Sequence, residues 1–240
     1  MNILEIEGLY KYFGGLAAAA AVDLHVEEGE IVGLIGPNGA GKTTVFNLVS
    51  GALVPDSGTV RFKGISIGGL KPYRIARMGI ARTFQSVKVF SKMTVLDNVL
   101  LGYLFGGSKP LAMTGPARRE TEEILAFMGL KEIMGTRAQD LILANQKKLE
   151  VARALATHPN LLLLDEVMAG LTPTEVAHSM ELVKKIRERG VTVFMIEHVM
   201  KAIMTICDRI IVLHHGEKIA EGTPQEIVRN RTVVEVYLGD

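Results

Sequence analysis

Cysteine is almost absent from this sequence, and neither sign of charge is in excess. The single cysteine, Cys207, excludes a disulfide bond within the chain and fits a reducing, cytosolic setting. The 240 residues carry 27 Lys and Arg against 26 Asp and Glu, so binding of nucleic acid through overall charge is not expected. With 48% hydrophobic and 22% charged residues, the chain is expected to fold around a sizeable core.

Long hydrophobic runs are missing as well. The longest unbroken apolar stretch, residues 12–22 with its glycines counted, has eleven residues, whereas a membrane-spanning helix needs about 20. The first residues, MNILEIEGLYK, lack the basic segment and apolar core of a secretory signal. We therefore expect a chain that is not secreted and does not cross a membrane by itself.

Short strand-like segments alternate with longer helical ones along the sequence. This alternation predicts an α/β fold with a mainly parallel sheet. The apolar runs at 31–36, 160–166 and 191–197 are typical of strands covered on both faces. The segments 3–9, 21–26 and 59–64 alternate apolar and polar residues instead, which predicts an antiparallel β region near the N-terminus.

The middle of the chain is mostly helical in character. Helices are predicted at 94–104, 116–130 and 145–157. We interpret residues 86–157 as a helical subdomain inserted into a single domain that spans residues 1–240. Beyond it we expect helices at 173–189, 199–207, 224–230 and 233–238 and a strand at 209–214.

The strongest motif is GPNGAGKT, residues 36–43, which matches the phosphate-loop pattern G-x-x-x-x-G-K-[ST] between an apolar strand and a helical stretch. Gly39 and Gly41 let the backbone curl, Lys42 is placed to bridge the outer phosphates, and the Thr43 hydroxyl is a candidate ligand for Mg²⁺. The alternative is a glycine-rich turn that binds nothing. The candidate nucleotide-binding residues are Gly36, Pro37, Asn38, Gly39, Ala40, Gly41, Lys42, Thr43 and Thr44.

Two adjacent carboxylates end the apolar run LLLLDE. Because ligands of open α/β sheets bind at the carboxyl ends of the strands, Asp165 is a candidate Mg²⁺ ligand and Glu166 a candidate for orienting the attacking water. An Asp-Glu pair at a strand end can also cap a helix. Its position after a phosphate loop favours the catalytic interpretation.

With both motifs in place, the chain resembles the nucleotide-binding subunits of ABC transporters. Six features occur in that family's order: an aromatic in KYFGG, the phosphate loop, a glutamine in ARTFQ, a helix entering VARALA, the Asp-Glu strand and the histidine of MIEH. The segments YFGGL, GIARTFQ, MTVLDNV, IEHVM and AEGTP…YLG are similar to the ATPases of branched-chain amino acid importers, in particular the longer of the two cassette types that pair there.

The resemblance implies roles for four further side chains. Phe13, or alternatively Tyr12, would stack on adenine, although either could be a core aromatic. Gln85 would contact Mg²⁺ and the attacking water beside the site where the membrane partner docks. His198 would hydrogen-bond the γ-phosphate, although a lone histidine at a strand end is more often structural.

The sequence departs from the family at the signature that closes over the partner's ATP. The usual Leu-Ser-Gly-Gly-Gln falls on Leu141, Ile142, Leu143, Ala144 and Asn145, so the serine and both glycines are missing. We expect the helix starting near Asn145 still to offer N–H groups, with Asn145 capping it or replacing the glutamine. The expected result is asymmetry in a mixed dimer, with the site of this chain's phosphate loop and Glu166 as the faster one.

The resemblance as a whole implies an ATP-hydrolysing motor subunit of an importer for branched-chain amino acids or related small polar solutes, with ATP and Mg²⁺ as cofactors. Its partners would be transmembrane permease subunits and a second ATPase, identical or different, but no nucleic acid. It would sit on the cytoplasmic face of the inner (plasma) membrane through the permease. The docking groove is expected beside Gln85, with Val87, Val89 and Phe90 as candidate lining. Two alternatives stay open: an assembly or regulatory module with weak hydrolysis, and a soluble ABC ATPase not linked to transport.

Overall fold

A computed structural model of the chain describes residues 1–106 and 115–238. Residues 107–114, within the stretch expected to form a helical subdomain, lie outside the described part, as do residues 239–240. None of the helices in the described ranges combines the length and apolarity that crossing a bilayer requires.

The central sheet has six strands in the order β10-β9-β3-β8-β7-β6. All its neighbouring strands run parallel except β9 and β10. Every residue of β3, β7 and β8 is buried, as expected for apolar strands covered on both faces. The strands are β3 (Ile31–Ile35), β6 (Ile80–Arg82), β7 (Leu161–Asp165), β8 (Thr192–Ile196), β9 (Arg209–His214) and β10 (Glu217–Gly222).

A second sheet of four antiparallel strands has the order β2-β1-β4-β5. The N-terminal strands pair with one another in a sheet of their own. The first two are longer than predicted, whereas the strand predicted at 59–64 lies at 57–62. Bulges shift the register along the first strand, including one between Ile6 and Leu9, where Gly8 takes a φ of 53°. The strands are β1 (Asn2–Phe13), β2 (Leu16–Glu27), β4 (Ser57–Phe62) and β5 (Ile65–Ser66).

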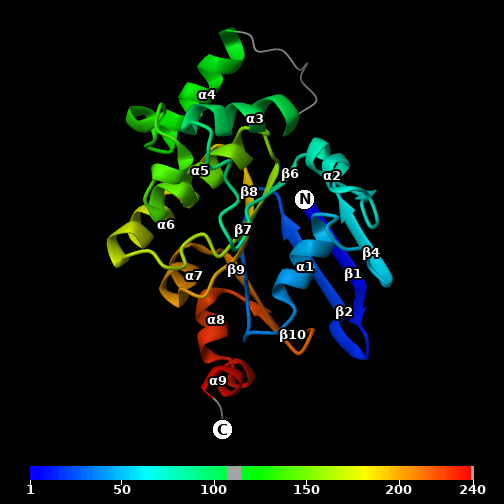
Figure 1. The fold of residues 1–240 in the computed structure, drawn as a ribbon. Helices are drawn as coiled ribbons and strands as arrows, with labels where there is room; N and C mark the ends of the chain where they lie inside the picture. The colour runs from blue at the N-terminus through cyan, green and yellow to red at the C-terminus, as the bar shows by residue number, and fades with distance from the viewer. Residues whose placement is uncertain (107–114, 239–240) are drawn as a thin grey trace.

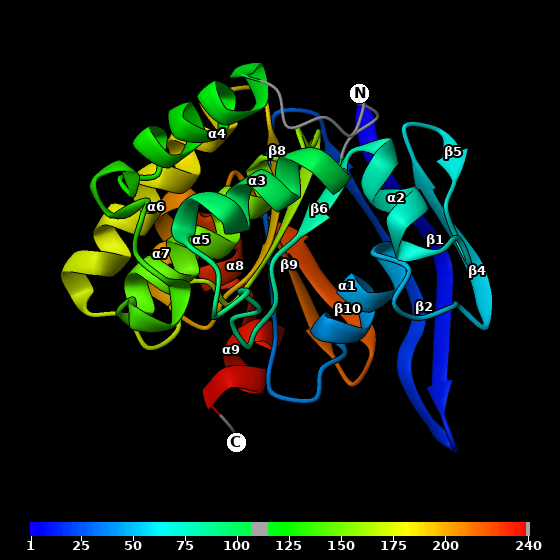
Figure 2. The same ribbon diagram turned by 45° about the horizontal axis from the view of Figure 1, so that its top comes forward.

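Helices cover the central sheet on both faces. Figures 1 and 2 show α1 between the two sheets, whereas α3 to α7 lie on the other side of the central sheet. This arrangement confirms the predicted α/β fold. The helices are α1 (Lys42–Val49), α2 (Pro72–Met78), α3 (Val95–Gly106), α4 (Gly115–Phe127), α5 (Leu143–Leu155), α6 (Pro173–Glu188), α7 (Met200–Ile206), α8 (Pro224–Arg229) and α9 (Arg231–Leu238), with 3₁₀ turns η1 (Lys131–Ile133) and η2 (Ala138–Asp140).

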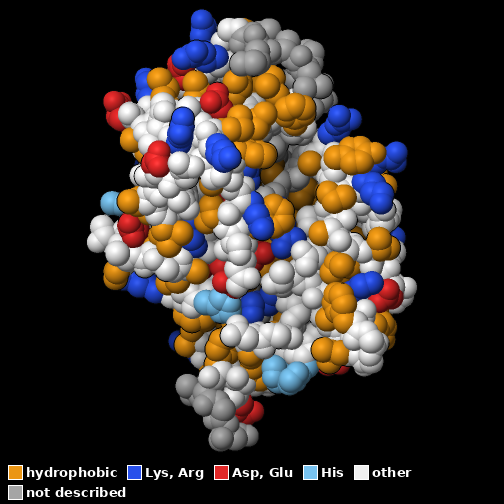
Figure 3. Space-filling view, in the orientation of Figure 1, with side chains coloured by type: hydrophobic (Ala, Val, Ile, Leu, Met, Phe, Trp, Pro, Cys, Tyr) orange, Lys and Arg blue, Asp and Glu red, His pale blue; other side chains and the backbone are white. Residues whose placement is uncertain are grey.

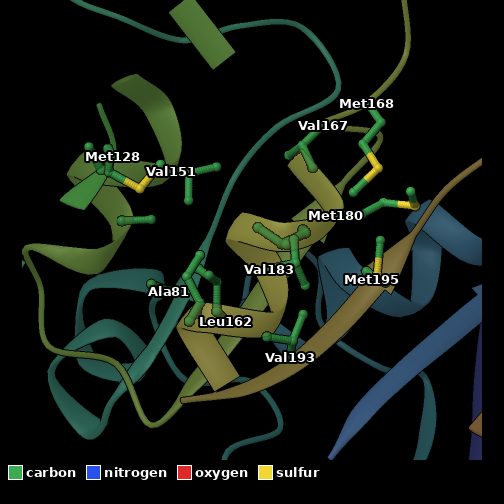
Figure 4. Packing of buried hydrophobic residues seen from close by; sticks show 14 of the residues in the cluster. Ala81, Met128, Val151, Leu162, Val167, Met168, Met180, Val183, Val193 and Met195 are labelled. Carbon is green, nitrogen blue, oxygen red and sulfur yellow. The ribbon is translucent and has the colours of Figure 1, made fainter. Parts of the chain in front are cut away.

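The buried apolar residues form two cores, one on each face of the central sheet. The first packs α1 between the sheets, with Phe46 against Phe194 at a ring separation of 5.0 Å. The second joins the sheet to α3–α7, and Figure 4 shows Met128, Met168 and Met180 among its buried side chains. The elements that carry the candidate site are therefore anchored in packed interior on both sides.

Candidate functional site

The carboxyl ends of four parallel strands meet at one edge of the central sheet. In the strand register, Leu34 of β3 and Asp165 of β7 both pair with Ile196 of β8. The phosphate loop follows β3, Glu166 follows β7, His198 follows β8 and Gln85 follows β6. Residues far apart in the sequence are thus delivered to one place, where ligands of such sheets bind.

The phosphate loop curls tightly because two of its glycines lie against backbone. A Cβ on Gly36 would lie 2.1 Å from the Leu213 carbonyl oxygen, and one on Gly41 would lie 2.2 Å from that of Ala18. Gly41 also has a φ of 99° and precedes the first residue of α1, where no side chain caps the helix. The first N–H groups of α1 are therefore available to an anion.

The Lys42 side chain folds back over the loop. Its Nζ donates hydrogen bonds to the carbonyl oxygens of Gly36 at 2.7 Å and Pro37 at 2.9 Å. Burial lowers the pKa of this ammonium group, while Glu166 and Asp165 act in the opposite direction. A cation with only carbonyl partners can exchange them for phosphate oxygens.

Glu166 stands at the centre of the candidate catalytic group. Gln85 Nε2 donates to its Oε2 at 3.0 Å, and His198 Nε2 lies 2.9 Å from its Oε1. Its backbone has a φ of 53°, a strained value for a residue with a side chain, and Lys147 Nζ donates to its carbonyl oxygen at 2.8 Å. The carboxylate is thus held between side chains from two other strand ends.

Asp165 is buried and keeps one oxygen available. Arg82 Nη2 donates to its Oδ2 at 2.8 Å, while Oδ1 is buried with no hydrogen-bond partner. An unpaired buried carboxylate oxygen, with the Thr43 hydroxyl and the Gln85 amide on the neighbouring pocket wall, is an oxygen donor set that suits Mg²⁺. The residues present therefore fit the metal that the sequence predicts.

A pocket of about 370 Å³ joins the phosphate loop to Gln85, Glu166 and His198, and Phe13 is in its wall. Tyr12 instead stacks on Tyr10 with ring centroids 6.0 Å apart. Phe13 is therefore the better candidate for contact with a base. The pocket is lined by Phe13, Ala18, Asn38, Gly39, Ala40, Gly41, Lys42, Thr43, Thr44, Gln85, Glu166 and His198.

The altered signature segment lies outside this pocket. Helix α5 starts at Leu143 with Ile142 as its N-cap residue, and no side chain caps it. The expected capping role of Asn145 is wrong, because this residue lies inside the first turn. Ile142 and Leu143 are instead exposed apolar side chains at the start of the helix, 64% and 44% exposed.

Sequence reasoning missed three charged residues around the site: Arg82, Lys147 and Glu197. Glu197 is 1% exposed, and its Oε1 accepts the Met168 N–H at 2.7 Å. Lys147 and Arg82 bond to the two adjacent residues Glu166 and Asp165. The available signal was weak, since each is a charged residue next to a motif without a fixed spacing to it.

The buried carboxyl group of Glu197 should make the free energy of unfolding depend on pH. Burial raises the pKa of its carboxyl from 4.5 to about 7, against the opposing effects of the Met168 N–H and Lys147. The unfolded chain loses this proton near pH 4.5 and the folded chain only near pH 7, so the free energy of unfolding falls across this window by about 3 kcal/mol.

We expect Glu197→Gln to reduce the fall in melting temperature between pH 5 and pH 8 by roughly 6 °C, measured by circular dichroism. The amide oxygen can still accept the Met168 N–H. Glu188→Gln, the same change on an exposed carboxylate of α6, is the control and should keep the full fall. An unaltered pH dependence in Glu197→Gln would contradict this account.

A groove of about 620 Å³ with mainly hydrophobic walls lies between α2, α3 and α5, and we call it the apolar groove. Figure 3 shows hydrophobic side chains on both sides of a hollow in this region. Of the three predicted lining residues only Phe90 is in its wall; Val89 packs against the core instead, and Val87 does not line it. The lining includes Ser50, Tyr73, Ile75, Ala76, Arg82, Phe84, Phe90, Leu101, Phe105, Glu150, Arg153, Ala154 and Thr157.

Comparisons with known proteins agree with these observations. Residues 19–169 match the family model described as ABC transporter, and residues 217–240 match the one described as branched-chain amino acid ATP-binding cassette transporter. The chain is 42% identical to the high-affinity branched-chain amino acid transport ATP-binding protein BraF of Pseudomonas aeruginosa, over 99% of this chain and 98% of that protein.

Solved structures are similar over most or all of the chain. A nucleotide-free ATP-binding cassette from an ABC transporter has a TM-score of 0.92 and 31% identity, with 100% of both chains covered. A dimeric cassette bound to ADP and phosphate has a TM-score of 0.83 and 28% identity, covering 92% of this chain and 98% of that one.

Proposed function

Because the chain belongs to the ATP-binding subunits of ABC transporters, we propose that it is the ATP-hydrolysing motor of an importer for branched-chain amino acids. The observation that carries this proposal is the pocket in which Gln85, Glu166 and His198 lie beside the phosphate loop and its Lys42. The relatives and the C-terminal family match, both described by branched-chain amino acid transport, support the cargo.

The side chains of the pocket have distinct tasks in this proposal. Lys42 exchanges its carbonyl partners for the outer phosphates, and the N–H groups at the start of α1 bind the same anion. Glu166 orients the attacking water and accepts its proton, and Gln85 and His198 hold that carboxylate in place. In this proposal His198 also hydrogen-bonds the γ-phosphate.

Thr43, Gln85 and Asp165 are the residues that would hold Mg²⁺. Held by these residues, the metal would supply positive charge that offsets the negative charge of the outer phosphates. The unpartnered Oδ1 of Asp165 supports this assignment, because a buried carboxylate oxygen without a donor is costly unless a ligand or a water satisfies it.

The partners in this proposal are permease subunits and a second ATPase. The apolar groove, which lies next to the segment that carries Gln85, suits a short helix of a membrane partner. Docking there would hold the chain at the cytoplasmic face of the inner membrane. The alternatives without transport or with weak hydrolysis gain no support from the site, since Lys42, Glu166 and His198 all line the pocket.

Transport activity tests the proposal. In cells from which the gene has been deleted, uptake of labelled leucine, isoleucine and valine should fall, and the wild-type chain should restore it. Lys42→Ala, which removes the ammonium group of the phosphate loop, should not. Unaltered uptake in the deletion strain, with ATPase activity of the purified chain intact, would contradict the cargo while leaving the chemistry in place.

The apolar residues of the signature segment predict weak capture of the partner's ATP. Ile142 occupies the position of the family's serine, and a hydroxyl bonded to a charged phosphate contributes about 1.5–3 kcal/mol. We expect Ile142→Ser to tighten ATP-dependent association of cassettes by about 10- to 100-fold in analytical ultracentrifugation. Leu143→Ser, the same kind of change one residue on, is the control; an equal gain there would contradict a position-specific contact.

A further inference from the structure

One buried arginine contacts both the apolar groove and the residue that would bind metal. The Arg82 side chain is 7% exposed, and its Nη2 donates to Asp165 Oδ2 at 2.8 Å. Its Nη1 donates to Asn47 Oδ1 at 2.6 Å and to Ser50 Oγ at 3.0 Å. Arg82 therefore joins β6, the C-terminal half of α1 and the end of β7.

The same guanidinium group is held by aromatic rings. Its centre lies 5.7 Å from the ring of Phe46 and 5.2 Å from the ring of Phe84, both within cation–π range. Phe46 belongs to the core between the sheets, whereas Phe84 and Arg82 line the apolar groove. A shift of Phe84 on filling of the groove would therefore act directly on the arginine.

The two carboxylate oxygens of Asp165 have different surroundings because of the contact with Arg82. Oδ2 is occupied by Arg82, and Oδ1 is buried without a partner. A hydrogen bond to one carboxylate oxygen also fixes the orientation of the other oxygen. Residues that hydrogen-bond to a metal ligand in this way affect the affinity of the site for the metal. Phe84 lies next to Gln85, so the groove wall and the nucleotide pocket are adjacent along the chain.

We propose that Arg82 is a positioning residue that connects the apolar groove to the metal-binding carboxylate of Asp165. It holds Oδ2 so that Oδ1 stays available for the metal, and an occupant of the groove strengthens this contact by packing on Phe84. The inference rests on the proposed function, because it requires that the chain binds ATP with Mg²⁺ and docks on permease subunits.

Mn²⁺ binding tests the first half of the proposal without measuring turnover. The full chain is saturated with a non-hydrolysable ATP analogue, and free Mn²⁺ is followed by electron paramagnetic resonance. We expect Arg82→Met to bind Mn²⁺ about 10- to 100-fold more weakly than wild type, and Arg82→Lys to lie between them, because lysine keeps the charge but not the fork of donors. Metal-free binding of the analogue should be unaltered.

The control is Arg61→Met, which removes an arginine that pairs with Glu7 at 2.8 Å on the second sheet, away from the nucleotide pocket. It should bind Mn²⁺ as wild type does. Wild-type Mn²⁺ affinity in Arg82→Met would overturn the inference; if that variant does not fold, wild-type affinity in Arg82→Lys would overturn it. A wild-type chain that fails to bind the nucleotide would instead overturn the proposed function.

The proposed effect of groove occupancy on the contact between Arg82 and Asp165 is tested in the complex with the permease subunits in nanodiscs. Compared with the free chain, the assembled wild type should bind Mn²⁺ at least threefold more tightly, and Arg82→Lys should lose this gain. An equal gain in both would overturn the connection to the apolar groove.

Discussion

Glu166→Gln is expected to lower ATP turnover by about 10²- to 10⁴-fold while nucleotide affinity changes less than threefold. The carboxylate is 12% exposed at its side chain and is held by Gln85 and His198, so the isosteric amide can keep its place. What the amide loses is the capacity to accept a proton from water. The measurement is phosphate release at saturating ATP, together with equilibrium binding of ATP.

Glu197→Gln is the matched control for this change. It makes the same substitution at the end of the neighbouring strand β8, in a carboxyl group that bonds to the Met168 N–H and does not line the pocket. Its turnover should fall at most threefold. If both variants lose turnover alike, Glu166 has no special role and the proposed chemistry is wrong.

The same Glu166→Gln chain reports on pairing. Blocked hydrolysis should trap a closed dimer, so light scattering with ATP would move from 26.1 kDa to twice that mass if the chain pairs with itself. A monomer that still binds ATP would indicate a different partner cassette. That result would support the asymmetry in which this chain's own phosphate loop meets a regular signature.

Gly41→Ala is expected to lower ATP affinity by more than 100-fold. Its new Cβ would lie 2.2 Å from the carbonyl oxygen of Ala18, on β2, at a φ of 99°. Both the clash and the strain act on the residue just before α1, so the loop must open to relieve them. Titration calorimetry with ATP measures the loss.

Gly39→Ala separates strain from collision. Gly39 has a φ of 80°, but a Cβ there would meet nothing within 4 Å. Left-handed strain costs about 1–2 kcal/mol, so its affinity should fall by about 5- to 30-fold. Equal losses in the two variants would show that backbone strain alone, and not contact with β2, fixes the shape of the loop.

The fold class and the family could be predicted from the sequence because their signals are local. The buried strands β3, β7 and β8 are apolar runs in the sequence. The phosphate-loop pattern contains three glycines, which allow the tight backbone turn that the loop requires. The strand β10, by contrast, has no buried residue and therefore no apolar pattern to detect. The short helix α2 buries only Ile75 and was missed for the same reason.

The environment of the candidate site could not be predicted, because it depends on the order of strands in the sheet. Arg82 contacts Asp165 since β6 and β7 are neighbours, although 83 positions separate the two residues. The raised pKa of Glu197 likewise could not be predicted, because it results from the burial of the side chain in the fold. The helix boundary at Leu143 was missed because the first residues of α5 are apolar and carry no capping side chain.

Helix α5 begins at the altered signature and continues into the wall of the apolar groove. Its thirteen residues, Leu143–Leu155, span about 20 Å at the rise of an α-helix. Glu150, Arg153 and Ala154 line the groove, whereas Ile142 precedes the other end. Because so short an α-helix moves as a rigid body, we expect closure over a neighbour's nucleotide at one end of α5 to be coupled to movement at the proposed docking groove at the other.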